Sequence, residues 1–85
     1  MKYKEIVELY QWCKENLIHC NLEPLFDGYQ IRFLDNSDII QHFGSYGNQE
    51  GFVEPAGIDP DYDYSAVSLE KMKEILSKKY LTNNP

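Results

Sequence analysis

The sequence predicts an α+β protein in which an N-terminal helix, a three- to four-stranded antiparallel sheet and a C-terminal helix packed on the sheet follow one another along 85 residues. Apolar residues near both ends recur at spacings of three and four, which is typical of amphipathic helices. In the middle, short alternating runs are separated by turn-forming pairs, which is typical of strands. Neither helix can bury its apolar stripe alone, so both should cover one sheet face. We expect a single domain over residues 1–80 and a frayed tail over residues 81–85.

The first helix is predicted over residues 3–18, which contain no Pro and no Gly. Charged residues occupy the side opposite the apolar stripe. The stripe consists of Tyr3, Ile6, Val7, Tyr10, Cys13 and Leu17.

A β-hairpin is predicted to follow. Residues 20–26 read as a short extended segment, and Pro24 removes one ladder donor, so this segment is an edge strand or a loop. Asp27-Gly28 is predicted to form the turn, because a type I′ turn needs positive φ at both central positions. Residues 29–33 alternate apolar and polar side chains, which indicates a strand with one buried face.

Two further strands are predicted after a turn at residues 35–37. Residues 38–43 are interpreted as a strand, because two β-branched residues and an aromatic follow the turn. A short helix with Asp38 as its N-cap is the alternative. A glycine-rich loop over residues 44–51 leads to a fourth short strand, residues 51–56, which Pro55 ends.

The second helix is predicted over residues 68–80, after an irregular acidic loop at residues 57–65. Ser68 is the expected N-cap, and apolar residues follow at helical spacing. Lys78 and Lys79 fall in the last turn, where the helix dipole favours cations.

Charge is distributed unevenly along the chain. The net charge is −6, and residues 35–70 contain eight carboxylates but no Lys and no Arg. An acidic surface disfavours direct binding to nucleic-acid phosphate or to an anionic membrane. It favours a basic partner or a cation, or it serves only solubility.

We expect the protein to be cytoplasmic. No apolar segment of a signal peptide follows the charged start, and no run approaches the roughly 20 apolar residues that span a bilayer. The two cysteines, Cys13 and Cys20, are therefore expected to be reduced thiols.

The acidic loop partly matches a calcium-binding loop. Asp59, Asp61 and Asp63 occupy positions one, three and five of a twelve-residue loop, and Glu70 occupies position twelve. Position six is Tyr64, where the calcium loop needs Gly. A solvated acidic loop without metal is the favoured interpretation.

Four residues are candidate zinc ligands: Cys13, His19, Cys20 and His42. Their spacing is not that of a zinc site, since the chain has no C-x-x-C pair. Cys13 also lies on the buried stripe of the first helix, where a free cysteine behaves as a small hydrophobe. No metal and no cofactor is expected.

No spacing of nucleophile, base and acid is diagnostic of catalysis, so we do not expect an enzyme. The glycine-rich stretch Gly44-Ser45-Tyr46-Gly47 lacks the lysine of a phosphate-binding loop. Direct nucleic-acid binding is not expected either, because the surrounding carboxylates would repel phosphate.

The remaining feature is an acidic surface that contains aromatic side chains, including Tyr46 and Phe52. Tyrosine anchors protein interfaces well, and carboxylates around it select a basic partner. In an extended loop, alternate carboxylates would lie about 6.6 Å apart, close to the spacing of successive phosphates. The predicted contact residues are Glu50, Glu54, Asp59, Asp61, Tyr62, Asp63 and Tyr64. Alternatively, some tyrosines belong to the core and the acids only solubilise.

Part of the chain, residues 38–76, resembles small uncharacterised proteins of phages and prophages. The resemblance is carried by Ile40-Gln41-His42, Gly44-Ser45-Tyr46-Gly47, Phe52-Val53-Glu54-Pro55-Ala56 and Tyr64-Ser65-Ala66-Val67. In size and acidity the chain is also similar to anti-CRISPR and other anti-defence proteins. That similarity implies a stoichiometric inhibitor and assigns no role to any individual residue.

The functional hypothesis is a phage-encoded inhibitor that binds a basic host protein, such as a CRISPR effector, by occlusion or phosphate mimicry. It predicts neither membrane binding nor direct nucleic-acid binding. One alternative is a structural or regulatory module that binds zinc or calcium. Another is an antitoxin or immunity protein, which would differ only in its partner.

Overall fold

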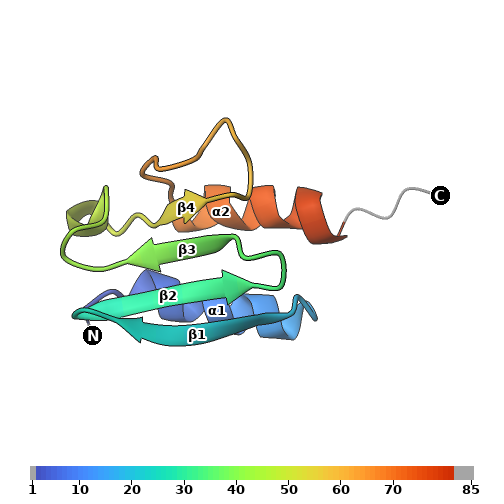
Figure 1. Ribbon diagram of the computed structural model, residues 1–85, viewed down its shortest axis with the longest axis horizontal. Helices are drawn as coiled ribbons and strands as arrows, with labels where there is room; N and C mark the ends of the chain where they lie inside the picture. Colours follow the sequence, from blue (N-terminus) through green and yellow to red (C-terminus); the bar gives the residue numbers. More distant parts are fainter. Residues whose placement is uncertain (1, 82–85) are drawn as a thin grey trace.

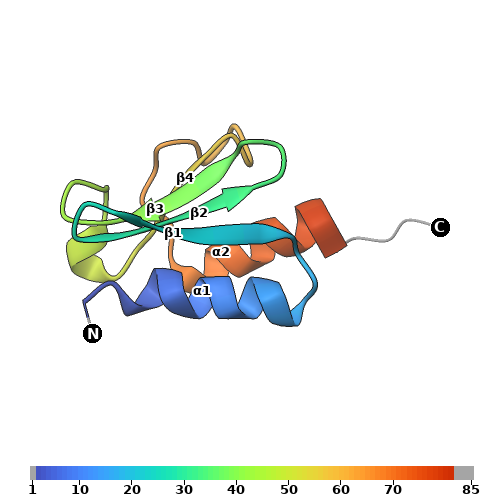
Figure 2. The same ribbon diagram turned by 60° about the horizontal axis from the view of Figure 1, so that its bottom comes forward.

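The computed structural model describes residues 2–81 and has the predicted α+β arrangement. Four antiparallel strands form one sheet in the order β1-β2-β3-β4, and both helices cover the same sheet face (Figures 1 and 2). The elements are α1 (Lys4–Glu15), β1 (Cys20–Leu25), β2 (Gly28–Phe33), β3 (Asp38–Gln41), the 3₁₀ turn η1 (Asn48–Glu50), β4 (Glu54–Ala56), α2 (Leu69–Leu76) and the π-helical turn η2 (Ser77–Leu81).

The first helix ends three residues earlier than predicted. Its last helical residue is Glu15, and Leu17 adopts a left-handed conformation with φ 61°. The N–H of Ile18 bonds to the carbonyl of Cys13, and the N–H of Leu17 bonds to that of Lys14. These two bonds form a Schellman motif, which satisfies the last carbonyls of the helix and turns the chain toward β1.

The predicted hairpin is present, but its turn lies one residue earlier than Asp27-Gly28. Leu25 pairs with Gly28, so the two loop residues are Phe26, with φ 54°, and Asp27. Gly28 instead begins β2, where it lies against β3. A Cβ atom on Gly28 would lie 1.9 Å from the backbone oxygen of Gln41, so only glycine fits. Pro24 lies in the edge strand β1, so of the two predicted alternatives, edge strand and loop, the edge strand is confirmed.

The segment after the second turn is a strand and not a helix, although it ends at Gln41. Strand β4 is shorter than predicted, and Pro55 lies at its centre rather than at its end. Pro55 is tolerated there because β4 is the last strand of the sheet. Beyond it, Val53 pairs with Val67, and the N–H of Tyr64 bonds to the carbonyl of Pro55, which covers part of this edge.

The second helix begins as predicted. The hydroxyl of Ser68 accepts a hydrogen bond from the N–H of Lys71, which is the expected N-cap. Regular α-helix ends at Leu76, and a π-helical turn continues to Leu81. Residues 82–85 of the expected frayed tail lie outside the described residues.

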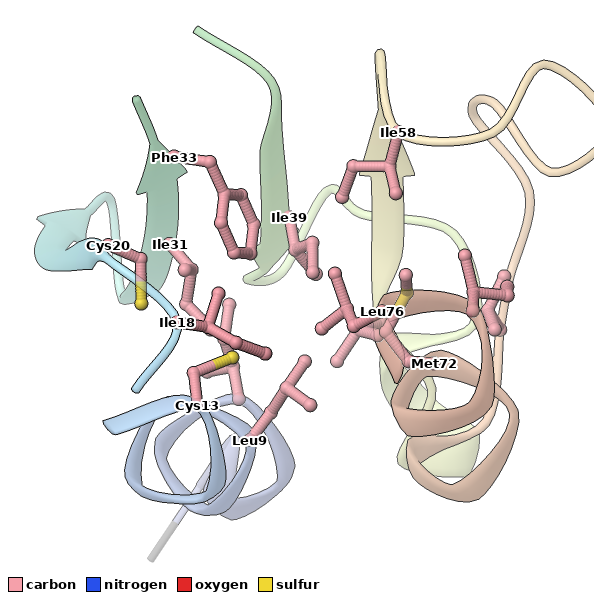
Figure 3. Packing of buried hydrophobic residues seen from close by; sticks show 14 of the residues in the cluster. Leu9, Cys13, Ile18, Cys20, Ile31, Phe33, Ile39, Ile58, Met72 and Leu76 are labelled. Atoms are coloured by element: carbon pink, nitrogen blue, oxygen red, sulfur yellow. The ribbon is translucent and has the colours of Figure 1, made fainter. Parts of the chain in front are cut away.

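The core lies between the sheet and the two helices. Its members include Leu9 and Cys13 from α1, Ile31 and Ile39 from the sheet, and Leu76 from α2 (Figure 3). Within this apolar layer Gln41 is fully buried. The side chain of Tyr3, the N-cap residue of α1, accepts no hydrogen bond from the first turn of the helix. The side-chain oxygen of Gln41 accepts the N–H of Ile6 in that turn instead. Gln41 thus caps α1 from the sheet.

The strands run along the long axis, so the connections gather at two ends of the molecule (Figure 1). The β1–β2 turn and the connection from β3 to β4 lie at one end. The α1–β1 connection, the β2–β3 turn and η2 lie at the other. Across residues 2–81, no helix has the length and apolarity to cross a membrane.

Candidate partner-binding surface

The fold separates the charges of the chain into two layers. Residues 16–68, which form the sheet and the loops, hold nine of the fourteen carboxylates and only one basic side chain, Arg32, so their formal charge is −8. The two helices with their flanking residues hold all seven lysines and the other five carboxylates, so their formal charge is +2. We call these the sheet-and-loop layer and the helical layer.

The two layers also differ in how far their carboxylates are paired with cations. In the helical layer, Lys73 Nζ lies 3.7 Å from Glu8 Oε2, and Lys71 Nζ lies 3.0 Å from Glu74 Oε1. Among the residues that the structure describes, six carboxylates of the sheet-and-loop layer have no basic side chain within 4 Å. These six are Asp38, Glu50, Glu54, Asp59, Asp61 and Asp63. All five predicted acidic contact residues are therefore outside direct ion pairs, while Asp59 and Asp61 line one pocket together with Lys71 and Lys78 of the helical layer.

The acidic loop is folded into turns and is not extended. The N–H of Tyr62 bonds to the carbonyl of Asp59, and the Oδ1 atom of Asp59 accepts the N–H of Asp61 at 3.0 Å. Asp63 reaches across the loop, where its Oδ1 atom accepts the N–H of Gly57 at 2.8 Å. The condition for a regular spacing of carboxylates, an extended loop, is therefore not met, and residues 57–65 form an irregular loop, as predicted. The short Asp side chains bond to nearby backbone N–H groups and close turns instead.

The two predicted contact tyrosines have different environments. Tyr62 is half-buried and packs against the core, and Lys71 Nζ lies 5.4 Å from the centre of its ring. It therefore supports the loop as well as facing solvent. Tyr64 is exposed, with φ 59°, and its N–H is held by the carbonyl of Pro55. Tyr64 is the more accessible of the two.

A third tyrosine, outside the predicted contact set, joins this surface. Tyr46 is exposed, and its N–H bonds to the Oε1 atom of Glu54 at 2.8 Å. Glu54 precedes Pro55 in β4, so the backbones of Tyr46 and Tyr64 are both attached to this short strand. Glu50 is exposed in η1 between Tyr46 and β4. The structure thus attaches Tyr46 and Tyr64 to β4, which contains Glu54.

Sequence reasoning missed an aromatic cluster at the end of the molecule that holds the β1–β2 turn. Phe26, His42 and Phe43 contact one another there. Phe26 was expected inside an extended segment before the turn, and Phe43 inside a strand. Their exposure follows from the actual turn position and from the early end of β3. The one available clue was an aromatic residue directly before Asp27-Gly28.

Asp27 holds this end of the molecule together. Its Oδ1 atom accepts the N–H of Phe43 at 3.0 Å, and its Oδ2 atom accepts the hydroxyl of Tyr3 at 2.7 Å. Burial raises the pKa of Asp27, but the hydrogen bonds from Tyr3 and Phe43 outweigh it and hold the pKa below its ordinary value. The same bond to Asp27 raises the pKa of the Tyr3 hydroxyl.

The four zinc-ligand candidates do not converge. Cys13 and Cys20 are both buried free thiols whose sulfur atoms face each other between α1 and β1 (Figure 3). The hydrogen bond with Cys20 and burial raise the pKa of Cys13. His19 is exposed beside Cys20, whereas His42 lies beyond Gln41 at the other end of the sheet.

The calcium-loop candidates do not converge either. Asp59 and Asp63 bond to backbone N–H groups, while Glu70 is exposed in the first turn of α2. Residues 2–81 contain no group of three or more side chains arranged to hold a metal ion.

Comparisons of the chain with protein-family models, with curated proteins and with solved structures gave no match. Chemically, the surface around β4 offers unpaired carboxylates, which attract cations, and exposed aromatic rings, which desolvate readily on contact.

Proposed function

We propose that this chain is a small acidic binding protein that inhibits a host nucleic-acid enzyme, in the manner of an anti-CRISPR protein. It would bind the Lys- and Arg-lined groove that normally holds DNA or RNA, and so exclude the nucleic acid. The observation that carries this proposal is the segregation of charge, −8 on the sheet-and-loop layer against +2 on the helical layer.

Solubility alone does not explain this segregation, because mixed charges on all faces keep a protein soluble equally well. A layer with one sign of charge produces a directional field, which steers a basic partner to that layer and raises the association rate. The exposed rings of Tyr46 and Tyr64 supply contact area within the same layer.

The folded acidic loop favours occlusion over strict phosphate mimicry. A mimic of the phosphate register would need carboxylates at regular intervals along an extended backbone, whereas the Asp59–Asp63 turn groups them irregularly. Occlusion requires only that a negative surface of suitable size fills the groove. For a phage-encoded inhibitor of this kind, the proposed site of action is the cytoplasm of the infected cell.

The test is capture of a partner from a host lysate with tagged protein, at low and at roughly physiological salt, read by mass spectrometry. Two matched triple variants accompany the wild type. One is D59N/D61N/D63N in the acidic loop, and the other is E8Q/E15Q/E70Q on the helical layer. Each changes the net charge from −6 to −3. Asn retains a side-chain oxygen that can accept the N–H groups of Asp61 and Gly57, so the loop should keep its fold.

We expect the wild type and the helical-layer variant to capture the same basic nucleic-acid enzyme, with less captured at higher salt. The loop variant should capture it much more weakly. Equal capture by both variants would contradict the proposal, because net charge rather than the sheet-and-loop layer would then control binding. A captured toxin would assign the same surface to an antitoxin or immunity protein.

A further inference from the structure

Two exposed phenylalanines form the end of the molecule where β1 turns into β2 and β3 ends. Phe26 is 75% exposed and Phe43 is 66% exposed. Their ring centroids lie 5.8 Å apart in an edge-to-face arrangement, and His42 lies 5.1 Å from Phe26 and 5.7 Å from Phe43. We call these three rings the aromatic tip. Of the three, His42 is buried, whereas the two phenylalanine rings contribute little burial to folding, so an interaction of these two rings with another molecule is the better explanation.

The backbone at Phe26 supports the same conclusion. Phe26 has φ 54°, in the left-handed region that Gly, Asn and Asp occupy most easily. A bulky aromatic residue strains the backbone there and gains no burial in return. Asn or Gly would be less strained at this position, so folding stability does not explain the phenylalanine.

The aromatic tip is held rigidly. Asp27 bonds to the N–H of Phe43, and Asn48 Nδ2 bonds to the carbonyl of Phe43 at 3.3 Å. The Nδ1 atom of His42 accepts the N–H of Gly44 at 2.9 Å, which fixes the imidazole ring that both phenylalanines contact. A surface that is already ordered loses little conformational entropy when a partner binds it.

The charge around the aromatic tip indicates which partner fits. Tyr46 follows Phe43 by three residues, and its N–H is bound by Glu54, so the tip continues into the acidic surface around β4. Glu50 follows in η1, and Glu5 packs against Gly51 at the same end of the fold. Two lysines lie at this end among the described residues: Lys2 Nζ pairs with Asp27 Oδ2 at 3.8 Å, and the exposed Lys4 begins α1 beside Glu5. Within residues 2–81, the tip is therefore flanked mainly by carboxylates.

The opposite end of the molecule also has exposed leucines, but lysines lie beside them, so it does not suit a basic partner. Leu17 and Leu34 are 86% and 82% exposed beside a groove of about 240 Å³. Lys14 adjoins Leu17, and Lys79 reaches Asp35 from η2. Two cations near this groove make it a poor match for a basic partner.

We propose that the aromatic tip is the apolar anchor of the complex, and that it inserts into an apolar pocket bordered by Lys and Arg side chains on the partner protein. This inference rests on the proposed function and names the part of the surface that supplies most of the binding energy. A second copy of this chain is disfavoured as the occupant, because two tips that meet would bring their flanking carboxylates together.

The experiment compares two double variants that are matched in exposure and in backbone conformation. F26N/F43S removes the aromatic tip, and L17N/L34S removes the leucines at the opposite end, where Leu17 also has positive φ, 61°. Each variant is checked for folding by circular dichroism and for oligomeric state by light scattering. Its affinity is then measured for the basic protein that the wild type captures.

We expect F26N/F43S to remain folded and to bind at least about 30-fold more weakly, which is the effect of losing a central aromatic anchor. L17N/L34S should bind within about twofold of wild type. Unchanged affinity of F26N/F43S would overturn the inference while the proposed function stands. A wild-type dimer that F26N/F43S converts to a monomer would overturn it in favour of self-association. If the wild type captures no basic protein, the inference and the proposed function both fail.

Discussion

The helical layer and the sheet-and-loop layer contain similar residue types but use charge in opposite ways. In the helical layer, lysines and glutamates are interleaved, and ion pairs such as Lys73–Glu8 connect α1 to α2. In the sheet-and-loop layer, carboxylates outnumber basic side chains nine to one. The helical layer therefore behaves as an ordinary solvated surface, and only the other layer produces a strong local field.

The comparison distinguishes carboxylates that also bond to the backbone from those whose side chains are fully available to a partner. Asp59 and Asp63 accept backbone N–H groups within the acidic loop, and Asp27 accepts the N–H of Phe43 from a separate segment. Glu50 and Asp61 are exposed, and among residues 2–81 their carboxylates accept no hydrogen bond. A sequence segment rich in acids is thus a mixture of structural and available charges, and the backbone contacts distinguish the two.

The largest expected effect on the free energy of unfolding comes from removing the Gln41 side chain, whose hydrogen bonds connect the sheet to α1. Gln41→Ala removes the oxygen that accepts the N–H of Ile6 and the amide that donates to Glu5. It leaves a buried N–H unpaired and a cavity behind, so we expect a loss of about 2–3 kcal/mol in the free energy of unfolding. Urea unfolding measures it. Gln30→Ala, on the open face of the same sheet, should cost less than about 1 kcal/mol. Equal losses would contradict the capping role of Gln41.

A smaller effect of opposite sign is expected at the aromatic tip. Phe26→Asn relieves the positive φ of a bulky residue and removes little buried surface, so it should stabilise the protein by about 0.5–1 kcal/mol. Phe43→Ser, at a residue outside the left-handed region, should change the free energy of unfolding by less than about 0.5 kcal/mol. Thermal unfolding of both variants tests this. Destabilisation by Phe26→Asn would show that Phe26 supports the fold through its ring contacts.

The smallest effect concerns the carboxylate of Asp35, which bonds to Ser37 in its own layer and to Lys79 of the helical layer, and this effect depends on pH. Hydrogen bonds from the Ser37 hydroxyl and N–H, followed by Lys79, lower the pKa of Asp35 from 3.8 to about 2. Because the folded pKa is depressed, this carboxylate stabilises the fold fully above pH 3.8, and the contribution is lost as pH falls toward 2. The difference in unfolding free energy between wild type and Asp35→Asn should therefore shrink across that window. Urea unfolding at several pH values measures it, and a constant difference would contradict the assignment.

Sequence patterns predicted the elements that depend on local chemistry. Helical spacing located both helices, Ser68 marked the start of α2, and the alternation from Tyr29 to Phe33 predicted β2. Element ends were predicted less well, since they depend on tertiary contacts. Helix α1 ends early because Leu17 adopts a left-handed conformation, and the hairpin turn shifts because Gly28 must lie against Gln41.

The candidate surface was predictable only in part. The run of acids from Glu50 to Asp63 is visible in the sequence, but the roles of Asp59 and Asp63 depend on turns that form around Gly57 and Asp61. The aromatic tip joins residues that are 17 positions apart through the pairing of three strands. Nothing local to Phe26 or Phe43 indicates that the two rings meet.

The central claim is that the sheet-and-loop layer occupies a nucleic-acid groove. The most direct test is displacement of labelled nucleic acid from the captured enzyme by wild-type protein, by D59N/D61N/D63N and by E8Q/E15Q/E70Q at one salt concentration. Wild type and E8Q/E15Q/E70Q should displace the label at similar concentrations, whereas D59N/D61N/D63N should require at least about tenfold more. Displacement by neither wild type nor variants, or equal displacement by all three, would contradict the claim.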